Sequence, residues 1–255
     1  MKWSEDEIEY LNENYPNFGP KELSIKLKRS VDSINIKLKS LDIRGQIFKK
    51  YDKFTFDLHN KTHLYLMGFL WADGYLHNTK NRLELSINTD DFNDIADYID
   101  TNYWAVYQRK RKNRKDQTTI GLYQEKVCDK FRIEYNYTEK SLKGPNFIDK
   151  IPESLLFYFV RGFFDGDGCF YLSKDNKQKQ CYLAGTYEQD WNWIEKILKG
   201  LSIEYLIKRK VQNIKSKYSI IYIIKKDIIK FGSYIYKDNS DRIGLKRKYE
   251  KFLKF

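Results

Sequence analysis

Two short segments of the chain end in Asp-Gly and closely resemble each other. Residues 66–74 read LMGFLWADG and residues 160–168 read VRGFFDGDG. Each segment is apolar and suited to a helix, and each carries two small residues one turn apart, which lie on one helical face. Two such faces allow two helices to pack with their backbones close together. Asp73 and Asp167 would then lie side by side at the same end of the pair.

A pair of carboxylates at two helix ends is suited to a hard divalent cation. A helix C-terminus carries carbonyls without partners and about half a negative charge. Mg²⁺ prefers an oxygen-rich site, and two adjacent carboxylates do not both stay ionised without a metal ion or a shared proton. We expect Gly74 and Gly168 to adopt the left-handed conformation that closes many helices. One copy alone could be a simple helix cap, but its repetition favours a paired-carboxylate site.

The two segments resemble the paired motifs of the LAGLIDADG homing endonucleases, in the form that carries both copies in one chain. The match is good at the glycine, at the second acidic position and at the final glycine of each copy. Trp71 departs from the pattern, because it occupies the place of the first aspartate, which Asp165 keeps in the second copy. The second aspartate binds metal in this family, so the resemblance assigns Asp73 and Asp167 as catalytic metal ligands. Asp165 is interpreted as structural.

The resemblance also implies the rest of the chemistry. It predicts hydrolysis of phosphodiesters with Mg²⁺ (or Mn²⁺), and it places Ala72 and Gly166 in the metal site beside the two aspartates. In the family, a lysine that follows the second hairpin of each half polarises the water network. The candidate lysines are Lys140, with Lys143 as runner-up, in the first half and Lys246 or Lys248 in the second.

The composition indicates a polyanionic partner. The 255-residue chain has 47 Lys and Arg against 35 Asp and Glu, a formal net charge of +12. Such a surplus favours nucleic acid or an anionic membrane, and no apolar run reaches the roughly 18 residues of a membrane-spanning helix. The three cysteines and three histidines show no zinc-binding spacing and no catalytic triad. We expect an intracellular protein of the cytoplasm or nucleoid, without a signal peptide.

Residues 1–44 read as a separate small helical unit. Ser4 and Glu7 form a capping box that opens the first helix, and Pro and Gly residues break the chain before two further short helices. Three helices with a turn before the last outline a helix-turn-helix module, and the opening segment resembles Myb-like domains. The third helix would carry the side chains that contact DNA, namely Asn35, Lys37 and Lys39. The alternative is a helical bundle with a solvated charged face. Residues 45–56 are the expected linker.

From about residue 57 the chain repeats one order of elements, in a first half at 57–150 and a second half at 151–255. Alternating apolar residues near 83–87 are typical of a strand. The first half continues with a helix at 91–101, a strand pair at 103–124 and a helix at 125–135. The second half has a motif helix at 154–166, a hairpin at 169–186, a helix at 188–200, a strand pair at 204–224 and a helix at 226–236. We predict an α+β fold in which two pseudo-symmetric αββαββα halves form a DNA-binding saddle of antiparallel sheets, preceded by a small three-helix domain.

Basic residues concentrate on the predicted hairpins of both halves. Since alternate strand residues face opposite sides, only about half of them can face DNA. A run of charge is more often a solvated surface, but its recurrence on equivalent hairpins favours a continuous track of phosphate contacts. The candidates are Arg109, Arg111, Arg114, Lys174, Lys177, Lys179, Lys208, Lys210, Lys215 and Lys217.

Residues and resemblance together predict a monomeric, Mg²⁺-dependent, site-specific endonuclease for double-stranded DNA. Two non-identical halves imply a long asymmetric target, of which each half cuts one strand. Two other roles stay open. One is a non-cleaving transcription regulator, against which the presence of both metal-site aspartates argues, and the other is an RNA maturase that assists intron splicing.

Overall fold

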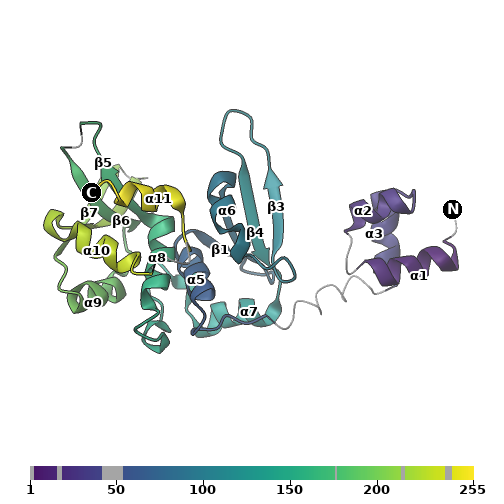
Figure 1. Ribbon diagram of the computed structural model, residues 1–255. Coiled ribbons are helices and arrows are strands. Elements are labelled where there is room, and N and C mark those ends of the chain that lie inside the picture. The colour runs from purple at the N-terminus through teal and green to yellow at the C-terminus, as the bar shows by residue number, and fades with distance from the viewer. Residues whose placement is uncertain (1–2, 16–18, 42–53, 176, 214–215, 239–242) are drawn as a thin grey trace. The chain divides into compact units, whose positions relative to one another are not determined.

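The structure is a computed structural model that describes residues 3–15, 19–41, 54–175, 177–213, 216–238 and 243–255 (Figure 1). The chain divides into two compact units, Met1–Phe54 and Thr55–Phe255. Within the described ranges, none of the helices has the length and apolar character needed to cross a membrane.

The first unit is a small bundle of α1 (Glu5–Asn14), α2 (Pro20–Lys26) and α3 (Val31–Ser40). The capping box is present: Ser4 Oγ accepts from the Glu7 N–H at 3.2 Å, and Glu7 Oε2 accepts from the Ser4 N–H at 2.9 Å. Glu7 also pairs with Arg29, whose guanidinium lies 4.2 Å from the Trp3 ring centroid. The core consists of Leu11, Tyr15, Leu23, Ile34 and Leu38. The three expected helices are therefore present.

The second unit contains two four-stranded antiparallel sheets of the same topology. The first sheet has the order β1-β2-β4-β3, from β1 (Gly74–Leu76), β2 (Leu83–Asn88), β3 (Ala105–Arg109) and β4 (Gln117–Leu122). The second has the order β5-β6-β8-β7, from β5 (Gly168–Leu172), β6 (Lys179–Thr186), β7 (Tyr205–Asn213) and β8 (Ser216–Ile223). The predicted α+β fold with two repeated halves is confirmed.

Helices and strands alternate along the chain in the same order in both halves, each beginning with a helix. The first half has α5 (Lys61–Asp73), α6 (Thr89–Ile95) and α7 (Glu125–Asp129), and a short turn, η4 (Tyr137–Glu139), leads to Lys140. The second half has α8 (Leu156–Asp167), α9 (Asn192–Gly200) and α10 (Ile228–Ile235). A further helix, α11 (Lys246–Phe252), lies beyond the predicted repeat and was not expected. Its signal was present, because Leu245, Tyr249 and Phe252 recur at helical spacing.

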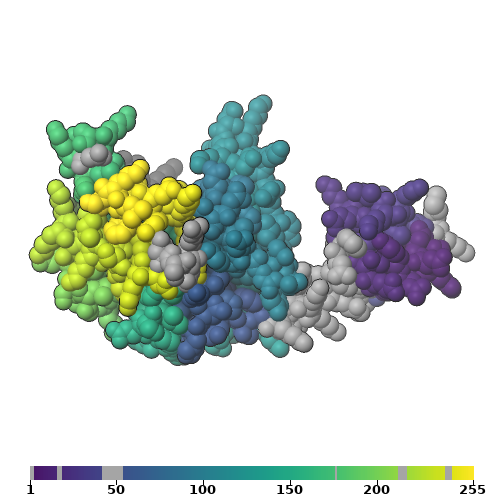
Figure 2. Space-filling model, in the orientation of Figure 1, coloured from purple at the N-terminus to yellow at the C-terminus, as the bar shows by residue number. Residues whose placement is uncertain are grey.

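Each sheet has one buried and one accessible face. The buried side chains are Leu83, Leu85 and Ile87 on β2, and Cys181 and Leu183 on β6. The alternate residues of both strands lie on the opposite face, as the two-residue period of a strand requires. The β3–β4 and β5–β6 hairpins project as two separate ridges (Figure 2).

Candidate active site

Helices α5 and α8 contact each other directly through glycine. A methyl group added at Gly68 would lie 2.0 Å from the carbonyl oxygen of Phe159, and one added at Gly162 would lie 2.0 Å from that of Tyr65. No larger residue fits at either position unless a helix moves. The close helix pair that the small residues predict is confirmed.

The same packing brings the C-terminal ends of the two helices together. A methyl group at Gly166 would lie 2.3 Å from Cβ of Ala72 and 3.2 Å from Oδ2 of Asp73. Asp73 is the last residue of α5, and it lies beside the last turn of α8, which ends at Asp167. Each half of the repeat therefore brings one carboxylate to the same place.

Gly74 and Gly168 do not adopt the left-handed conformation that we expected. Their φ angles are −74° and −90°, and both residues are extended. Space is the reason for glycine at these positions. A methyl group at Gly74 would lie 2.3 Å from the Tyr137 hydroxyl, and one at Gly168 would lie 2.2 Å from Cδ2 of Phe164. The chain passes directly from each helix into the first strand of its sheet.

Burial raises the pKa of both motif aspartates. Removal of the carboxylate from water is the main cause at Asp167, the charge of Asp73 adds to it, and the pKa reaches about 7. Partial removal from water likewise raises the pKa of Asp73, although this residue remains exposed at the surface. Lys140 and Lys248 act in the opposite direction on both aspartates. At Asp167 the contribution of Asp73 means that the two carboxylates lie close enough to interact.

Lys140 caps the end of α5. Its Nζ donates to the carbonyl oxygens of Leu70, Ala72 and Gly74, at 3.3, 3.0 and 2.8 Å. These carbonyls lie at a helix C-terminus, where the helix dipole favours a cation. Burial lowers the pKa of Lys140 to about 8, while the two motif aspartates oppose that shift.

Lys248 caps the end of α8 in the same way. Its Nζ donates to the carbonyl oxygens of Phe164, Asp165 and Gly168, at 2.7, 2.6 and 2.7 Å. Burial lowers its pKa as well. The two lysines thus occupy equivalent places at the two helix ends.

The other two candidate lysines lie away from these helix ends. Lys246 Nζ lies 3.8 Å from Oε1 of Glu250, and Lys143 Nζ lies 2.6 Å from Oε2 of Glu139. Their side chains are 75% and 56% exposed. Of the pair that the sequence left open, the structure places Lys248 beside the aspartates.

Buried polar side chains behind the site fasten the segment that leads to Lys248. Oδ2 of Asp165 accepts from the Tyr65 hydroxyl and from the Leu245 N–H, both at 2.8 Å. Arg161 is fully buried and donates to the carbonyl oxygens of Ile235, Asp238 and Ile243. The structural role expected for Asp165 agrees with these contacts. Arg161 was missed, although a charged residue inside an apolar motif was a visible signal.

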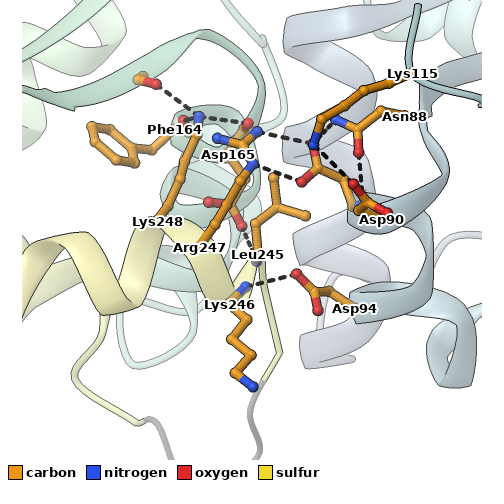
Figure 3. Close-up of polar contacts among 12 residues, drawn as sticks. Asn88, Asp90, Asp94, Lys115, Phe164, Asp165, Leu245, Lys246, Arg247 and Lys248 are labelled. Carbon is orange, nitrogen blue, oxygen red and sulfur yellow. Dashed lines mark hydrogen bonds and ion pairs between the residues drawn. The ribbon is translucent and has the colours of Figure 1, made fainter.

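Arg247 joins α11 to the first half of the repeat (Figure 3). Its Nε and Nη2 donate to the two carboxylate oxygens of Asp91 on α6, at 2.6 and 2.9 Å. The backbone N–H of Lys246 donates to Oδ2 of Asp94 at 2.9 Å. Nothing in the local sequence singled out either acidic residue, because both contacts join segments far apart in the chain.

A cavity of about 370 Å³ opens beside the helix ends. Asp167, Lys140 and Ala72 line it together with Ala184 and Thr186, which lie on β6. Among the described residues, no group of three or more His, Cys, Asp and Glu side chains could hold a metal ion. Further ligands for a cation beside the two aspartates would therefore be backbone carbonyls, water or substrate.

The predicted DNA-contacting residues of the second unit lie mostly at the hairpins. Arg109 ends β3, Arg111 bonds the Gln117 side chain, and Lys208 lies 5.7 Å from the Tyr222 ring centroid. Arg109, Arg114, Lys174, Lys177, Lys208, Lys210 and Lys217 are exposed. Lys215 lies outside the described residues.

Lys179 is a correction to the predicted track. It lies on the same side of β6 as the buried Cys181 and Leu183. Its Nζ donates to the carbonyl oxygen of Phe255 at 2.6 Å, so the side chain does not point to the accessible sheet face.

Asn35, Lys37 and Lys39 lie on α3 of the first unit. Lys37 Nζ lies 5.9 Å from the Trp3 ring centroid, whereas Lys39 is exposed. Their contact with DNA stays a prediction.

Comparison with known proteins gives one family-model match and several solved structures that overlap in part. A search of curated proteins finds no significant relative. Solved structures that overlap in part include I-DmoI in complex with DNA and Ca, at 13% identity, covering 70% of this chain and 90% of that chain with a TM-score of 0.45. A second is I-SmaMI bound to an uncleaved DNA target with calcium ions, at 12% identity, covering 76% of this chain and 88% of that chain with a TM-score of 0.44. A third is full-length DUF199/WhiA from Thermatoga maritima, at 16% identity, covering 81% of this chain and 63% of that chain with a TM-score of 0.46. Overlaps of this extent carry no conclusion about activity. Residues 154–236 match the family model of the LAGLIDADG-like domain.

Proposed function

We propose that the protein is a divalent-metal-dependent endonuclease that cuts double-stranded DNA at a specific site. The observation that carries this proposal is the meeting of Asp73 and Asp167, one from each half, at two paired helix ends. The LAGLIDADG-like domain at 154–236 supports the same class of activity.

Asp73 and Asp167 would hold Mg²⁺ or Mn²⁺, with the carbonyl groups of Ala72 and Gly166 beside them. The donor set consists of oxygen atoms, which these ions prefer. Removal from water is the main cause of the raised pKa of both carboxylates, and the charge of Asp73 adds to it at Asp167. A bound cation would stabilise the ionised form of both. When bound, the metal supplies a Lewis acid for the phosphate and a more acidic water.

Lys140 and Lys248 would stabilise the charge that develops on the phosphate. Backbone carbonyls hold each ammonium group at its helix end. A carbonyl group does not neutralise a lysine as a carboxylate does, so the positive charge stays available to a phosphate oxygen. With a pKa of about 8, Lys140 is mostly protonated at neutral pH.

The DNA would lie along the accessible sheet faces, where exposed basic residues such as Arg109, Lys208 and Lys210 contact phosphates. One row across the first sheet carries Tyr75, Glu84, Gly121 and Ala105. The corresponding row of the second sheet carries Cys169, Tyr182, Tyr222 and Leu206. Because base edges are read by the side chains that face them, these different rows predict an asymmetric target.

A selection from random DNA tests this proposal. The protein is incubated with Mg²⁺ and a randomised duplex library, and the cut ends are sequenced. We expect ends that share one asymmetric sequence, and we expect Asp73→Asn and Asp167→Asn each to produce none while DNA binding is retained. Asp90→Asn is a matched control, because that carboxylate pairs with Lys115 on the protein surface. Cleavage retained by either motif variant refutes the assignment.

The same experiment separates the alternative roles. A regulator would bind DNA without cutting it, and a maturase would bind structured RNA in a parallel assay. We further propose that α3 of the first unit anchors the monomeric protein on its target. Deletion of residues 1–44 is then expected to shorten the protected footprint, and an unchanged footprint would contradict an anchoring role.

A further inference from the structure

The segments that carry the two lysines are each held by the opposite half of the repeat. Lys248 lies in the second half, yet its neighbour Arg247 makes two hydrogen bonds to Asp91 of α6 in the first half (Figure 3). Both oxygens of the carboxylate are used, which is the strong, directional form of an ion pair. Asp91 is only 5% exposed, whereas the Arg247 side chain is 55% exposed, so the carboxylate end of this pair is shielded from water.

Asn88 holds Asp91 in the position from which it contacts Arg247. The side-chain oxygen of Asn88 accepts from the Asp91 N–H at 2.9 Å, and Nδ2 of Asn88 donates to Oδ2 of Asp91 at 2.6 Å. One turn further along α6, Asp94 accepts from the Lys246 N–H at 2.9 Å. The start of α6 therefore presents two carboxylates in set positions to the start of α11.

The segment that carries Lys140 has a matching contact in the other direction. Asp190 precedes α9 in the second half, and its Oδ2 accepts from the Gly144 N–H at 2.8 Å. The Asp190 N–H donates to the carbonyl oxygen of Ser141 at 2.8 Å, and the Gln189 side chain donates to the carbonyl oxygen of Lys140 at 3.3 Å. In both halves, an acidic residue near the start of the helix after the second strand holds the lysine segment of the other half.

We propose that Asp91 and Asp190 are reciprocal positioning residues, with Asp91 placing Lys248 and Asp190 placing Lys140. A positioning role in catalysis rests on the proposed nuclease function. The placement itself does not, because Lys248 is only 7% exposed and each Nζ bonds to carbonyls at a helix end. We call the contacts of Asp91 and Asp190 with the opposite half the two braces. When the Asp91 brace is lost, Lys248 leaves its helix end and Lys140 stays in place, and loss of the Asp190 brace has the reverse effect. The two strand-cutting centres are then tied together, since each depends on a contact from the other half.

Acylation of lysine amines, followed by mass spectrometry of the full chain without metal or DNA, tests the placement. In Asp91→Ala we expect Lys248 to react about tenfold faster or more, the effect of one lost charge-assisted contact, while Lys140 is unchanged. In Asp190→Ala we expect the reverse. Asp90→Ala is the control, because it removes the carboxylate next to Asp91 without touching α11. Equal acceleration at both lysines indicates general loosening and overturns the proposal, as does no acceleration at either.

Plasmid cleavage provides the second readout. Each brace variant is expected to accumulate nicked circles, with the nicks of Asp91→Ala and Asp190→Ala on opposite strands. Nicks on the same strand, or equal loss of both cuts, contradict the reciprocal assignment. If the unaltered protein cuts no DNA, the proposed function fails, and the acylation rates alone decide whether the braces exist.

Discussion

Trp71 in α5 and Asp165 in α8 occupy the same place in the two motif segments, yet their neighbours are of different kinds. The Trp71 ring packs edge-on against Tyr137 and Phe147, with centroids 5.5 and 5.6 Å apart. Asp165 instead accepts hydrogen bonds from the Tyr65 hydroxyl and the Leu245 N–H. Aromatic packing and a buried polar network thus serve equivalent positions of one repeated backbone.

One helical turn before Trp71 and Asp165, the first half again has an apolar residue, Met67, where the second half has a polar one, Arg161. Met67 of the first half is an ordinary buried apolar residue, whereas the equivalent Arg161 is buried and bonded to three backbone carbonyls. We attribute this difference to the segment that carries each lysine to its helix end. Lys140 directly follows η4, which packs against Trp71 through Tyr137. Lys248 arrives on α11 after a longer connection, and Arg161 and Asp165 fasten that connection.

Replacement of Trp71 by the residue found at the equivalent position 165 tests this comparison, and it has the largest expected effect on the free energy of unfolding. Trp71→Asp would give the first half the residue of the second half, and of the family pattern. We expect a loss of about 4 kcal/mol in the free energy of unfolding, because the ring contacts are lost and a carboxylate is buried without donors. Urea unfolding measures the change, and Trp71→Phe, which keeps a ring, is the milder control. If Asp at 71 left the stability unchanged, the two positions would be interchangeable and the comparison wrong.

The reverse exchange, Arg161→Met, should cost somewhat less. It leaves three carbonyl groups without their donor and removes one of the two cations, Arg161 and Lys248, that stabilise the Asp165 carboxylate. Loss of one partner from a buried charged network costs roughly 3 kcal/mol. Met67→Leu in the first half is the matched control, since exchange between apolar residues of similar volume usually costs less than about 1.5 kcal/mol. Equal effects of both changes on the urea midpoint would show that Arg161 acts only by filling space.

The sequence predicted those parts of the molecule that depend on local, repeated patterns. Asp73 and Asp167 could be placed together because the same small residues precede both, and the strand periods indicated both sheets. Lys248 could not be distinguished from Lys246, because the choice depends on which side of α11 faces α8. The braces at Asp91 and Asp190 could not be found either, since each joins segments that the sequence does not pair.

Glycine chemistry illustrates the same limit. Asp-Gly at a helix end suggested a left-handed residue, but Gly74 and Gly168 are extended, and what they need is room beside Tyr137 and Phe164. The need at Gly74 is created by Tyr137, a residue far along the chain, and leaves no local signal, whereas at Gly168 it comes from Phe164 one turn earlier on the same helix.

The smallest expected effect concerns pH and the site itself. The pKa of Asp167 is about 7 in the folded protein, above its value of about 4 in the unfolded chain. The folded state therefore binds the extra proton, and this carboxyl destabilises the fold increasingly as pH rises from about 4 to 7. Without metal, Asp167→Asn should be more stable to urea than the unaltered protein at pH 8, by about 1 kcal/mol. This is less than the roughly 4 kcal/mol that the whole pKa difference would give, because the side chain is partly open to solvent, and the gain should shrink towards pH 4. A gain of the same size at both pH values would show that charge is not its cause.

Calorimetric titration of Mn²⁺ into the full chain at pH 8 tests most directly whether the two halves build one metal site. We predict that the unaltered protein binds the ion, and that Asp73→Asn and Asp167→Asn each weaken binding by about tenfold or more, whereas Asp90→Asn does not. Unchanged affinity in either motif variant would contradict a site shared between the two helix ends.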